Sequence, residues 1–155
     1  MKVLTKKTDY AIRALLALAA GKDSYVSAKT ISAEQDIPYQ FLRTLLQEMI
    51  GMELIISKEG VQGGFRLNKE PDKIQVKHLI EGFQGKVQVS ECMFRKQLCK
   101  NRATCVLRHE IMRIEQVVSN EFEKITIGTL FRNLQMVNGL HQASESDRLP
   151  ESLQH

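Results

Sequence analysis

The feature that most constrains the fold is a tight turn between two short helical stretches. Residues 36–38 read Asp-Ile-Pro and separate a stretch over 27–35 from a second one, which runs from Pro38 to about Met49. Proline suits the first position of a helix, and Gly51 marks the end of the second stretch. A short helix, a tight turn and a second helix form the pattern of a helix-turn-helix.

A β-hairpin is predicted directly after these helices. Residues 54–56 form a candidate strand, KEGVQGG a glycine-rich turn, and residues 65–67 a returning strand. A helix-turn-helix followed by such a hairpin is a winged helix. We therefore expect a mainly α fold with a small β-hairpin wing, in which a winged helix-turn-helix head spans residues 1–70.

An amphipathic helix is predicted before the helix-turn-helix. It would reach about Ala20, with Thr8 or Asp9 as its N-terminal cap. The apolar spacing gives this helix an inward face. That face comprises Tyr10, Ala14, Leu15 and Leu18.

The second helix of the pair has two different faces. Its apolar face comprises Phe41, Leu42, Leu45 and Met49. Its polar face comprises Gln40, Arg43, Thr44 and Gln47. Side chains of the polar face are able to donate hydrogen bonds to base edges in a major groove. The alternative is a helix face that is merely solvated, but the adjoining wing favours DNA binding.

Four further segments follow the head. Residues 71–91 are a connector with a short helix, 92–105 a cysteine-containing loop, 106–137 a long helix and a C-terminal helix, and 138–155 a polar tail expected to be disordered. The long helix carries a near-heptad apolar seam, which predicts pairing with a second copy of the chain. Packing of this seam on the chain's own core is the alternative. The seam comprises Leu107, Ile111, Ile114, Val118, Phe122 and Ile125.

The only cysteines, Cys92, Cys99 and Cys105, fall within 14 residues. Closing so short a loop costs little entropy, and three cysteines cannot all pair in disulfides within the chain. Residues 93–113 contain six basic residues and a single acidic one, Glu110. The resulting positive field favours the thiolate form that binds metals. We expect a metal centre, with iron–sulfur favoured. Zinc held with His109, or a direct thiol switch, is the alternative.

Composition limits the remaining function classes. The net charge of +4 is a mild bias toward polyanions such as nucleic acids. An apolar run at 11–20 is interrupted by Arg13, and no stretch is long enough to span a membrane, so a cytoplasmic protein is expected. A nucleotide-binding glycine motif, a nucleophile elbow and paired catalytic carboxylates are not found, so we expect no enzyme. An electron-transfer protein is the other alternative.

Several motifs together resemble the Rrf2 family of bacterial iron–sulfur winged-helix regulators, which includes IscR-, NsrR- and RirA-like proteins. They are LTKKTDYAIRAL, IPYQFLRTLLQ, GVQGGFRL, the three-cysteine loop and ITIGTL, and they cover roughly residues 1–137. The resemblance implies a homodimer held by the long helix, with two winged heads on a partly palindromic DNA operator and a cluster beside each head. A transcriptional repressor that senses redox, nitric oxide or iron status is expected.

The resemblance also implies metal ligands. Cys92, Cys99 and Cys105 match the family's three thiolate ligands. An IscR-like pattern has a histidine three residues after the third cysteine, where this chain has Arg108, with His109 one position further. Asp9 matches an NsrR-like pattern, in which an aspartate of the partner subunit completes the site.

We favour Asp9 over His109 as the fourth ligand, although Asp9 also has a reading as a helix cap. Three thiolates and a carboxylate resemble a 4Fe–4S site with one exchangeable iron, whereas three thiolates and a histidine would suit 2Fe–2S. A change in such a cluster would reorganise residues 89–105 and thereby alter the spacing of the two heads on DNA.

The implied DNA contacts combine helix and wing. Gln40, Arg43 and Thr44 align with base-contacting positions of the family, and Gln47 extends their face. The wing has Glu59 where an IscR-like wing has arginine, and a carboxylate is repelled by a narrow minor groove. We therefore expect Lys58 to supply the wing's DNA contact. The turn beside it contains Gly63 and Gly64.

Overall fold

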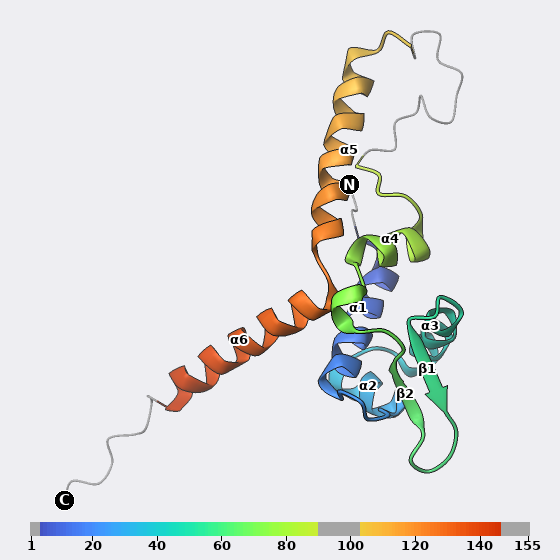
Figure 1. Ribbon diagram of the computed structural model, residues 1–155, viewed down its shortest axis with the longest axis vertical. Coiled ribbons are helices and arrows are strands. Elements are labelled where there is room, and N and C mark those ends of the chain that lie inside the picture. The colour runs from blue at the N-terminus through green and yellow to red at the C-terminus, as the bar shows by residue number, and fades with distance from the viewer. Residues whose placement is uncertain (1–3, 90–102, 147–155) are drawn as a thin grey trace, which may run out of the picture.

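A head, an upright helix and a projecting arm make up the molecule (Figure 1). The computed structural model describes residues 4–89 and 103–146. The head contains three helices and a two-stranded antiparallel hairpin, which confirms the predicted mainly α fold with a β-hairpin wing. In chain order the elements are α1 (Lys6–Ala20), α2 (Ala28–Gln35), α3 (Tyr39–Gly51), β1 (Ile55–Lys58), β2 (Gly64–Leu67), the 3-10 helix η1 (Pro71–Lys73), α4 (Val76–Gln84), α5 (Val106–Lys124) and α6 (Ile127–Ser146).

Helix α1 begins earlier than the sequence predicted. Thr5 is its N-terminal cap, and the Thr5 hydroxyl accepts a hydrogen bond from the Thr8 backbone N–H at 3.3 Å. Thr8 is fully buried, and its hydroxyl donates to Oε1 of Gln84 in α4 at 2.7 Å. The prediction of Thr8 or Asp9 as the cap was therefore wrong, since a distant glutamine engages Thr8 and both residues lie inside the helix.

The core of the head forms around α1. The four residues predicted for its inward face are all buried, and Ala14, Leu15 and Leu18 have no exposed surface. Alpha-helices α2 and α3 and strand β2 pack against this face. Burying each large aliphatic side chain stabilises the fold by about 1.5–3 kcal/mol. The other fully buried side chains include Ile31, Ile37, Leu42, Leu45, Leu46, Met49 and Ile55.

The turn between α2 and α3 is fixed by local hydrogen bonds. Asp36 adopts a left-handed backbone conformation with φ 50°, and the Ile37 backbone N–H donates to the Ser32 carbonyl at 3.1 Å. The Ser32 hydroxyl donates to the Ile37 carbonyl at 2.7 Å. A guanidinium nitrogen of Arg13 in α1 donates to the Gln35 carbonyl at 3.0 Å. These bonds set the direction in which α3 leaves the turn.

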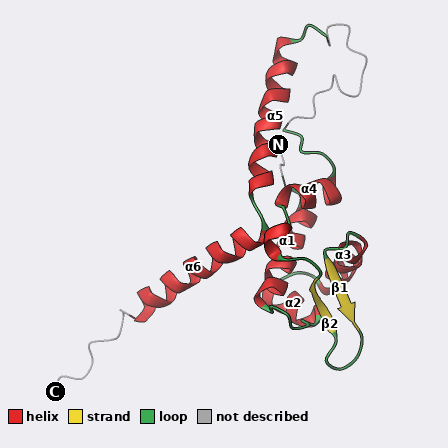
Figure 2. Ribbon diagram, in the orientation of Figure 1, coloured by secondary structure: helices red, strands yellow, loops and turns green. Residues whose placement is uncertain are grey.

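The hairpin pairs β1 with β2 beside α3 (Figure 2). Ile55 lies opposite Leu67, and Lys58 lies opposite Gly64. A third segment joins this sheet through an isolated bridge between Val26 and Phe65, whose backbones exchange hydrogen bonds of 2.9 and 2.8 Å. The sequence did not predict this third segment, because a single bridge leaves no alternating pattern.

The junction between α5 and α6 is anchored to the connector. The Val76 N–H donates to the Ile125 carbonyl and the Ile127 N–H donates to the Ile74 carbonyl, both at 2.9 Å. Beside these bonds Arg132 donates two hydrogen bonds to Asp72, at 2.8 and 2.9 Å. The hydrogen bond from Arg132 lowers the pKa of the Asp72 carboxyl below its ordinary value. The junction therefore forms part of the head's own structure.

The apolar seam of α5 divides into two halves. Val118, Phe122 and Ile125 pack against a buried cluster around α4, and Lys77 of α4 pairs with Glu123 at 2.8 Å. The N-terminal half of the seam, nearer Cys105, stays exposed: the Leu107 side chain is 66% exposed and that of Ile114 is 42% exposed. Packing on the chain's own core thus accounts for the C-terminal half alone.

The arm formed by α6 is longer than predicted. The expectation of disorder from residue 138 onward was wrong for 138–146, because α6 continues to Ser146. This stretch contains good helix formers such as Gln142 and Ala143. Residues 147–155 lie outside the described residues. In the described ranges we find no helix that is long and apolar enough to cross a membrane.

Two glycines of α6 give a matched test of the anchored junction. A side chain at Gly128 would collide with the Asp72 side chain, whereas one at Gly139 would meet no atom within 4 Å. We predict that Gly128→Ala destabilises the protein by about 1–3 kcal/mol through overpacking. Gly139→Ala should stabilise it by about 0.5–1 kcal/mol, because alanine favours a helix interior.

Urea unfolding followed by circular dichroism measures both variants. Equal effects of the two substitutions would show that the contact between Asp72 and the start of α6 contributes nothing.

Candidate DNA-binding surface and cysteine site

The polar face of α3 is exposed along its whole length. Gln40, Arg43, Thr44 and Gln47 are all exposed, whereas Leu42, Leu45, Leu46 and Met49 on the opposite face are at most 1% exposed. The Thr44 hydroxyl donates to the Gln40 carbonyl at 3.4 Å, so it remains close to the helix surface. The structure therefore brings the four predicted DNA-contacting residues of α3 to one accessible surface.

Phe41 departs from the prediction that it faces the core. It is 40% exposed and lies on the flank of α3, where its ring packs edge-on against Tyr10 with centroids 5.5 Å apart. About two turns further along the same flank, Glu48 pairs with Lys7 of α1 at 2.6 Å. Phe41 and Glu48 thus attach α3 to the first half of α1, and they leave the polar face free.

The wing places its predicted residues at the far end of the hairpin. Lys58 and Glu59 are exposed, and the turn closes with a 3.0 Å hydrogen bond from the Gly63 N–H to the Gly60 carbonyl. Gly64 has φ 146°, and a side chain there would collide with the backbone of Val26. Val61 at the tip is fully exposed.

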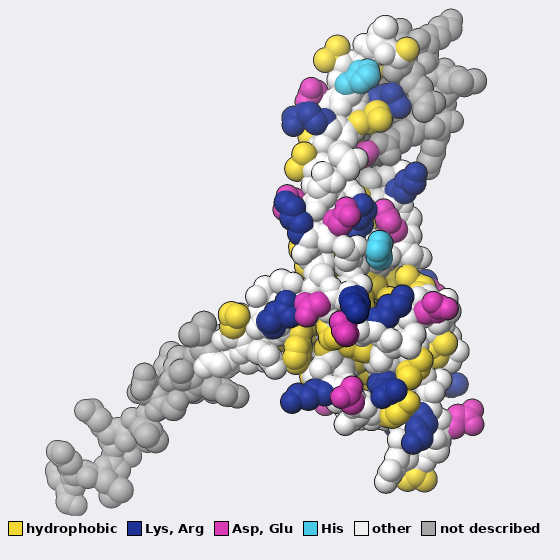
Figure 3. All heavy atoms as spheres, viewed as in Figure 1, with side chains coloured by type: hydrophobic (Ala, Val, Ile, Leu, Met, Phe, Trp, Pro, Cys, Tyr) yellow, Lys and Arg dark blue, Asp and Glu magenta, His cyan; other side chains and the backbone are white. Residues whose placement is uncertain are grey.

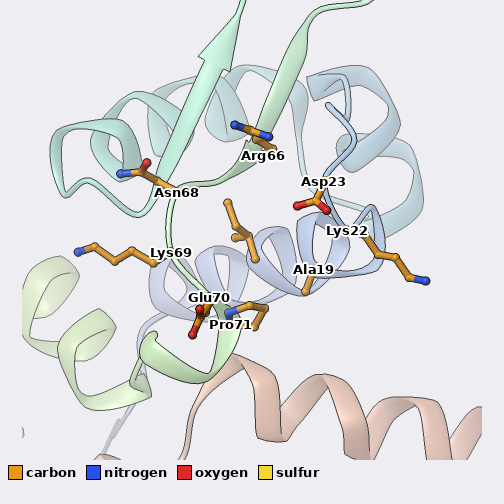
Figure 4. Close-up of a pocket in the computed structure, with 9 residues that line it drawn as sticks. Ala19, Lys22, Asp23, Arg66, Asn68, Lys69, Glu70 and Pro71 are labelled. Carbon is orange, nitrogen blue, oxygen red and sulfur yellow. The ribbon is translucent and has the colours of Figure 1, made fainter.

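Two hollows flank the hairpin. A groove of about 600 Å³ separates the wing turn from the segment that leads into α2, and Tyr25, Ser27 and Lys58 are among its lining residues. A cleft of about 420 Å³ lies between the end of α1 and the chain after β2. Figure 4 shows Arg66 on the β2 side of this cleft and Lys22 and Asp23 on the α1 side.

One of the three cysteines lies in the described residues. Cys105 is half-buried and occupies the N-terminal cap position of α5. Cys92 and Cys99 lie outside the described residues, as does most of the predicted loop 92–105. The chain enters that loop from Val89, whose backbone N–H donates to the Glu115 carboxylate in the middle of α5 at 3.1 Å. Both ends of the cysteine segment are therefore attached to α5.

The two candidates for the fourth ligand lie on different helices. Asp9 is half-buried on α1, where its carboxylate pairs with Arg13 at 3.1 Å. His109 is exposed on α5, one turn after Cys105, and its backbone N–H donates to the Cys105 carbonyl at 3.3 Å. Residues 4–89 and 103–146 contain no group of three or more acidic, histidine or cysteine side chains that could hold a metal ion.

Arg108 directly precedes His109 on α5. It is half-buried, and its Nε is buried without a hydrogen-bond partner. This cation occupies the position where an IscR-like pattern has histidine, so it adds positive charge next to Cys105 and supplies no metal ligand of its own.

Tyr25 and Arg66 were missed in the sequence. The cationic groups of Lys58 and Arg66 each lie over the Tyr25 ring. The alternation of β2, with Phe65 and Leu67 packed against the core, could have indicated that Arg66 points to the other face. The sequence around Tyr25 carried no such signal, because residues 22–26 were assigned to no element.

Comparisons with known proteins point to one family. The Rrf2 family model, described as an iron-dependent transcriptional regulator, matches residues 4–133. The chain is 31% identical over 150 residues to the transcriptional regulator IscR of Sodalis glossinidius, which covers 95% of this chain and 89% of that protein. It is 28% identical over 132 residues to the regulator NsrR of Oceanobacillus iheyensis, which covers 84% of this chain and 90% of that protein.

The fold is also found in a solved structure. CymR, the global cysteine regulator of Bacillus subtilis, superposes with a TM-score of 0.69 at 22% identity, over 86% of this chain and 98% of that chain. The family match extends from α1 through α5 into α6. The chain therefore belongs to the Rrf2 family, and it is a DNA-binding transcriptional regulator rather than an enzyme.

Proposed function

We propose that this regulator is a cytoplasmic homodimer that binds a partly palindromic operator and represses transcription. Its three cysteines would hold an iron–sulfur cluster that responds to redox state, nitric oxide or iron supply. The observation that carries the DNA-binding part is the exposed polar face of α3 above a fully buried apolar face. An iron-dependent family description and relatives named IscR and NsrR support the metal-dependent part.

The face of α3 has the chemistry for reading bases. Arg43 is able to donate two parallel hydrogen bonds to a guanine edge, and a glutamine such as Gln40 pairs in the same way with adenine. Thr44 and Gln47 extend this surface along the helix. Lys58 on the wing adds a cation beside it. Each good two-bond contact to a base contributes about 1–3 kcal/mol of discrimination against the wrong base.

The cysteine segment has a donor set that fits an iron–sulfur cluster. Thiolates are the preferred protein ligands of such clusters, and the segment carries three cysteines within 14 residues. Asp9 of the partner subunit is our first choice as the fourth ligand, with His109 as the alternative. When bound through three thiolates and one carboxylate, a 4Fe–4S cluster would keep one exchangeable iron; a 2Fe–2S cluster suits the histidine alternative.

The attachment of the cysteine segment to α5 supports coupling between metal and DNA. The Val89–Glu115 hydrogen bond attaches one end of the segment to the middle of α5, and Cys105 attaches the other end to the N-terminus of the same helix. A change in coordination would therefore shift α5 relative to the loop. Since two heads must match half-sites about 34–36 Å apart, a small shift alters operator affinity.

The exposed half of α5 supports the homodimer. Leu107, Ile114 and Val117 are 66%, 42% and 51% exposed and occupy one side of the helix. Figure 3 shows apolar side chains spaced along the outer edge of this helix, interleaved with charged ones. A helix that projects from a head with such a stripe is stabilised by a partner that covers it.

Substituting Arg43 tests the reading helix. Arg43→Ala should weaken binding to a duplex selected from a random-sequence pool by about 1–3 kcal/mol and relax the preference at one base pair. Fluorescence anisotropy with the selected duplex and its single-base variants measures both effects. Lys73→Ala on η1 removes one positive charge away from α3 and serves as the control. Equal losses at every base variant would show that Arg43 contacts only the backbone.

Replacing a cysteine tests the cluster. After anaerobic reconstitution, wild type should be coloured and contain iron and acid-labile sulfide, whereas Cys105→Ser should lose both. Asp9→Asn should make the bound iron easier to chelate, and His109→Asn should leave it unchanged. If the protein instead contains zinc and no acid-labile sulfide, the cysteines form a zinc site and hold no cluster. A colourless, metal-free wild type with oxidisable thiols would indicate a direct thiol switch.

A charge in the exposed stripe tests the dimer. Ile114→Lys should weaken self-association by more than about a hundredfold, because a two-fold interface loses the same aliphatic contact, about 1.5–3 kcal/mol, twice. Gln116→Lys adds the same charge on a different side of α5 and should leave the dimer intact. Light scattering coupled to size exclusion reports both masses. A dimeric Ile114→Lys protein would place the interface elsewhere.

A further inference from the structure

We propose that Lys58 and Arg66, gathered around Tyr25 on the outer face of the wing sheet, bind the phosphate backbone of DNA. The cluster Tyr25–Lys58–Arg66 would hold the duplex in register while α3 reads its bases. This inference rests on the proposed function, since it assigns a second, sequence-independent contact to the same DNA-binding head.

The register of the sheet brings these three residues to one face. Lys58 lies opposite Gly64 on β2, and Arg66 is two residues further along β2, so both point to the same side. The bridge between Val26 and Phe65 places Tyr25 opposite Arg66. Phe65 and Leu67 point to the other side and pack against the core.

Both cations lie over the ring of Tyr25. Strand β2 lies between β1 and the Tyr25 segment, and Gly64 lets the backbone of Val26 approach closely, since a side chain at position 64 would collide with it. The Lys58 ammonium lies 5.6 Å from the centre of the Tyr25 ring, and the Arg66 guanidinium lies 5.2 Å from it. One aromatic ring therefore holds two cations through attraction to its π face.

The two cations lack an acidic partner. Among the described residues neither Lys58 nor Arg66 forms an ion pair, and Nε of Arg66 is buried without a hydrogen-bond acceptor. The ring offsets only part of the repulsion between two like charges. An anion placed between them would remove that repulsion and supply acceptors, and a phosphate matches both a guanidinium and an ammonium.

The surroundings favour a DNA backbone over a small anion. Lys58 and Tyr25 line the groove of about 600 Å³ between the wing turn and the start of α2, which is open rather than enclosed. Ser27 and Thr30 line the same groove, and hydroxyls are common partners of DNA phosphates. At the wing tip Glu59 opposes entry into a minor groove, so the sheet face rather than the tip carries the contact.

Salt dependence of DNA binding tests this contact. Affinities are measured for a duplex selected by wild type from a random pool and for a shuffled duplex of equal composition, between about 50 and 200 mM salt. Lys58→Gln and Arg66→Gln should each reduce the slope of log affinity against log salt by about 0.9. Each should weaken both duplexes by the same factor, because phosphates carry no sequence information.

Two controls keep the assignment specific. Lys73→Gln on η1 removes the same charge elsewhere and should leave the slope unchanged. Tyr25→Phe keeps the ring and should bind as wild type, whereas Tyr25→Ala should weaken both duplexes. If Arg66→Gln fails to fold, the salt slope of the Lys58→Gln variant alone tests the contact, because Lys58 is exposed.

The outcomes separate this inference from the proposed function. Unchanged slopes for Lys58→Gln and Arg66→Gln, in a wild type that prefers its selected duplex, would overturn the phosphate contact only. A loss confined to the selected duplex would also overturn it, since that pattern indicates base reading. A wild type without any preference between the two duplexes would overturn sequence-specific regulation. In that case the salt slopes of the variants on the shuffled duplex would still test the phosphate contact.

Discussion

The close packing around α1 is the constraint on which the rest of the structure depends. Ala11 and Ala14 present small side chains that are fully buried, so neighbouring elements approach the helix closely. The hairpin, α2, α3, α4 and α6 all pack against α1. Arg13 fixes the end of α2 and Lys7 fixes the flank of α3. The reading helix and the connector to α5 therefore share one rigid support.

This support makes α5 a helix with two different roles. Its C-terminal half belongs to the chain's own structure, through Phe122 and the paired backbones around Ile125 and Ile127. Its N-terminal half extends away from the head and begins directly after its cap residue Cys105 (Figure 1). We infer that a disturbance at the cysteine end acts on a helix whose other end is firmly anchored to the head. Such an arrangement would convert a small local change into a change of head position.

Local signals in the sequence predicted the fold, and long-range contacts limited the prediction. Pro38 and the wing glycines act on their own neighbours, so the helix-turn-helix and the hairpin could be located. The cap of α1 was misplaced because Thr8 bonds to Gln84, far away in sequence. Phe41 fits the apolar period of α3 but lies against Tyr10 at its flank. The polar face of α3 was predictable, whereas the cluster around Tyr25 depends on an isolated bridge between strands.

We infer that occupancy of the cysteine site changes the affinity of the head for DNA. The most direct measurement is the affinity of one anaerobic protein sample for its selected duplex before and after removal of the bound metal by a chelator, at constant salt. A coupling of about 1–3 kcal/mol predicts that the two affinities differ by roughly 5- to 150-fold. Equal affinities, in a sample that has demonstrably lost its metal, would contradict the account.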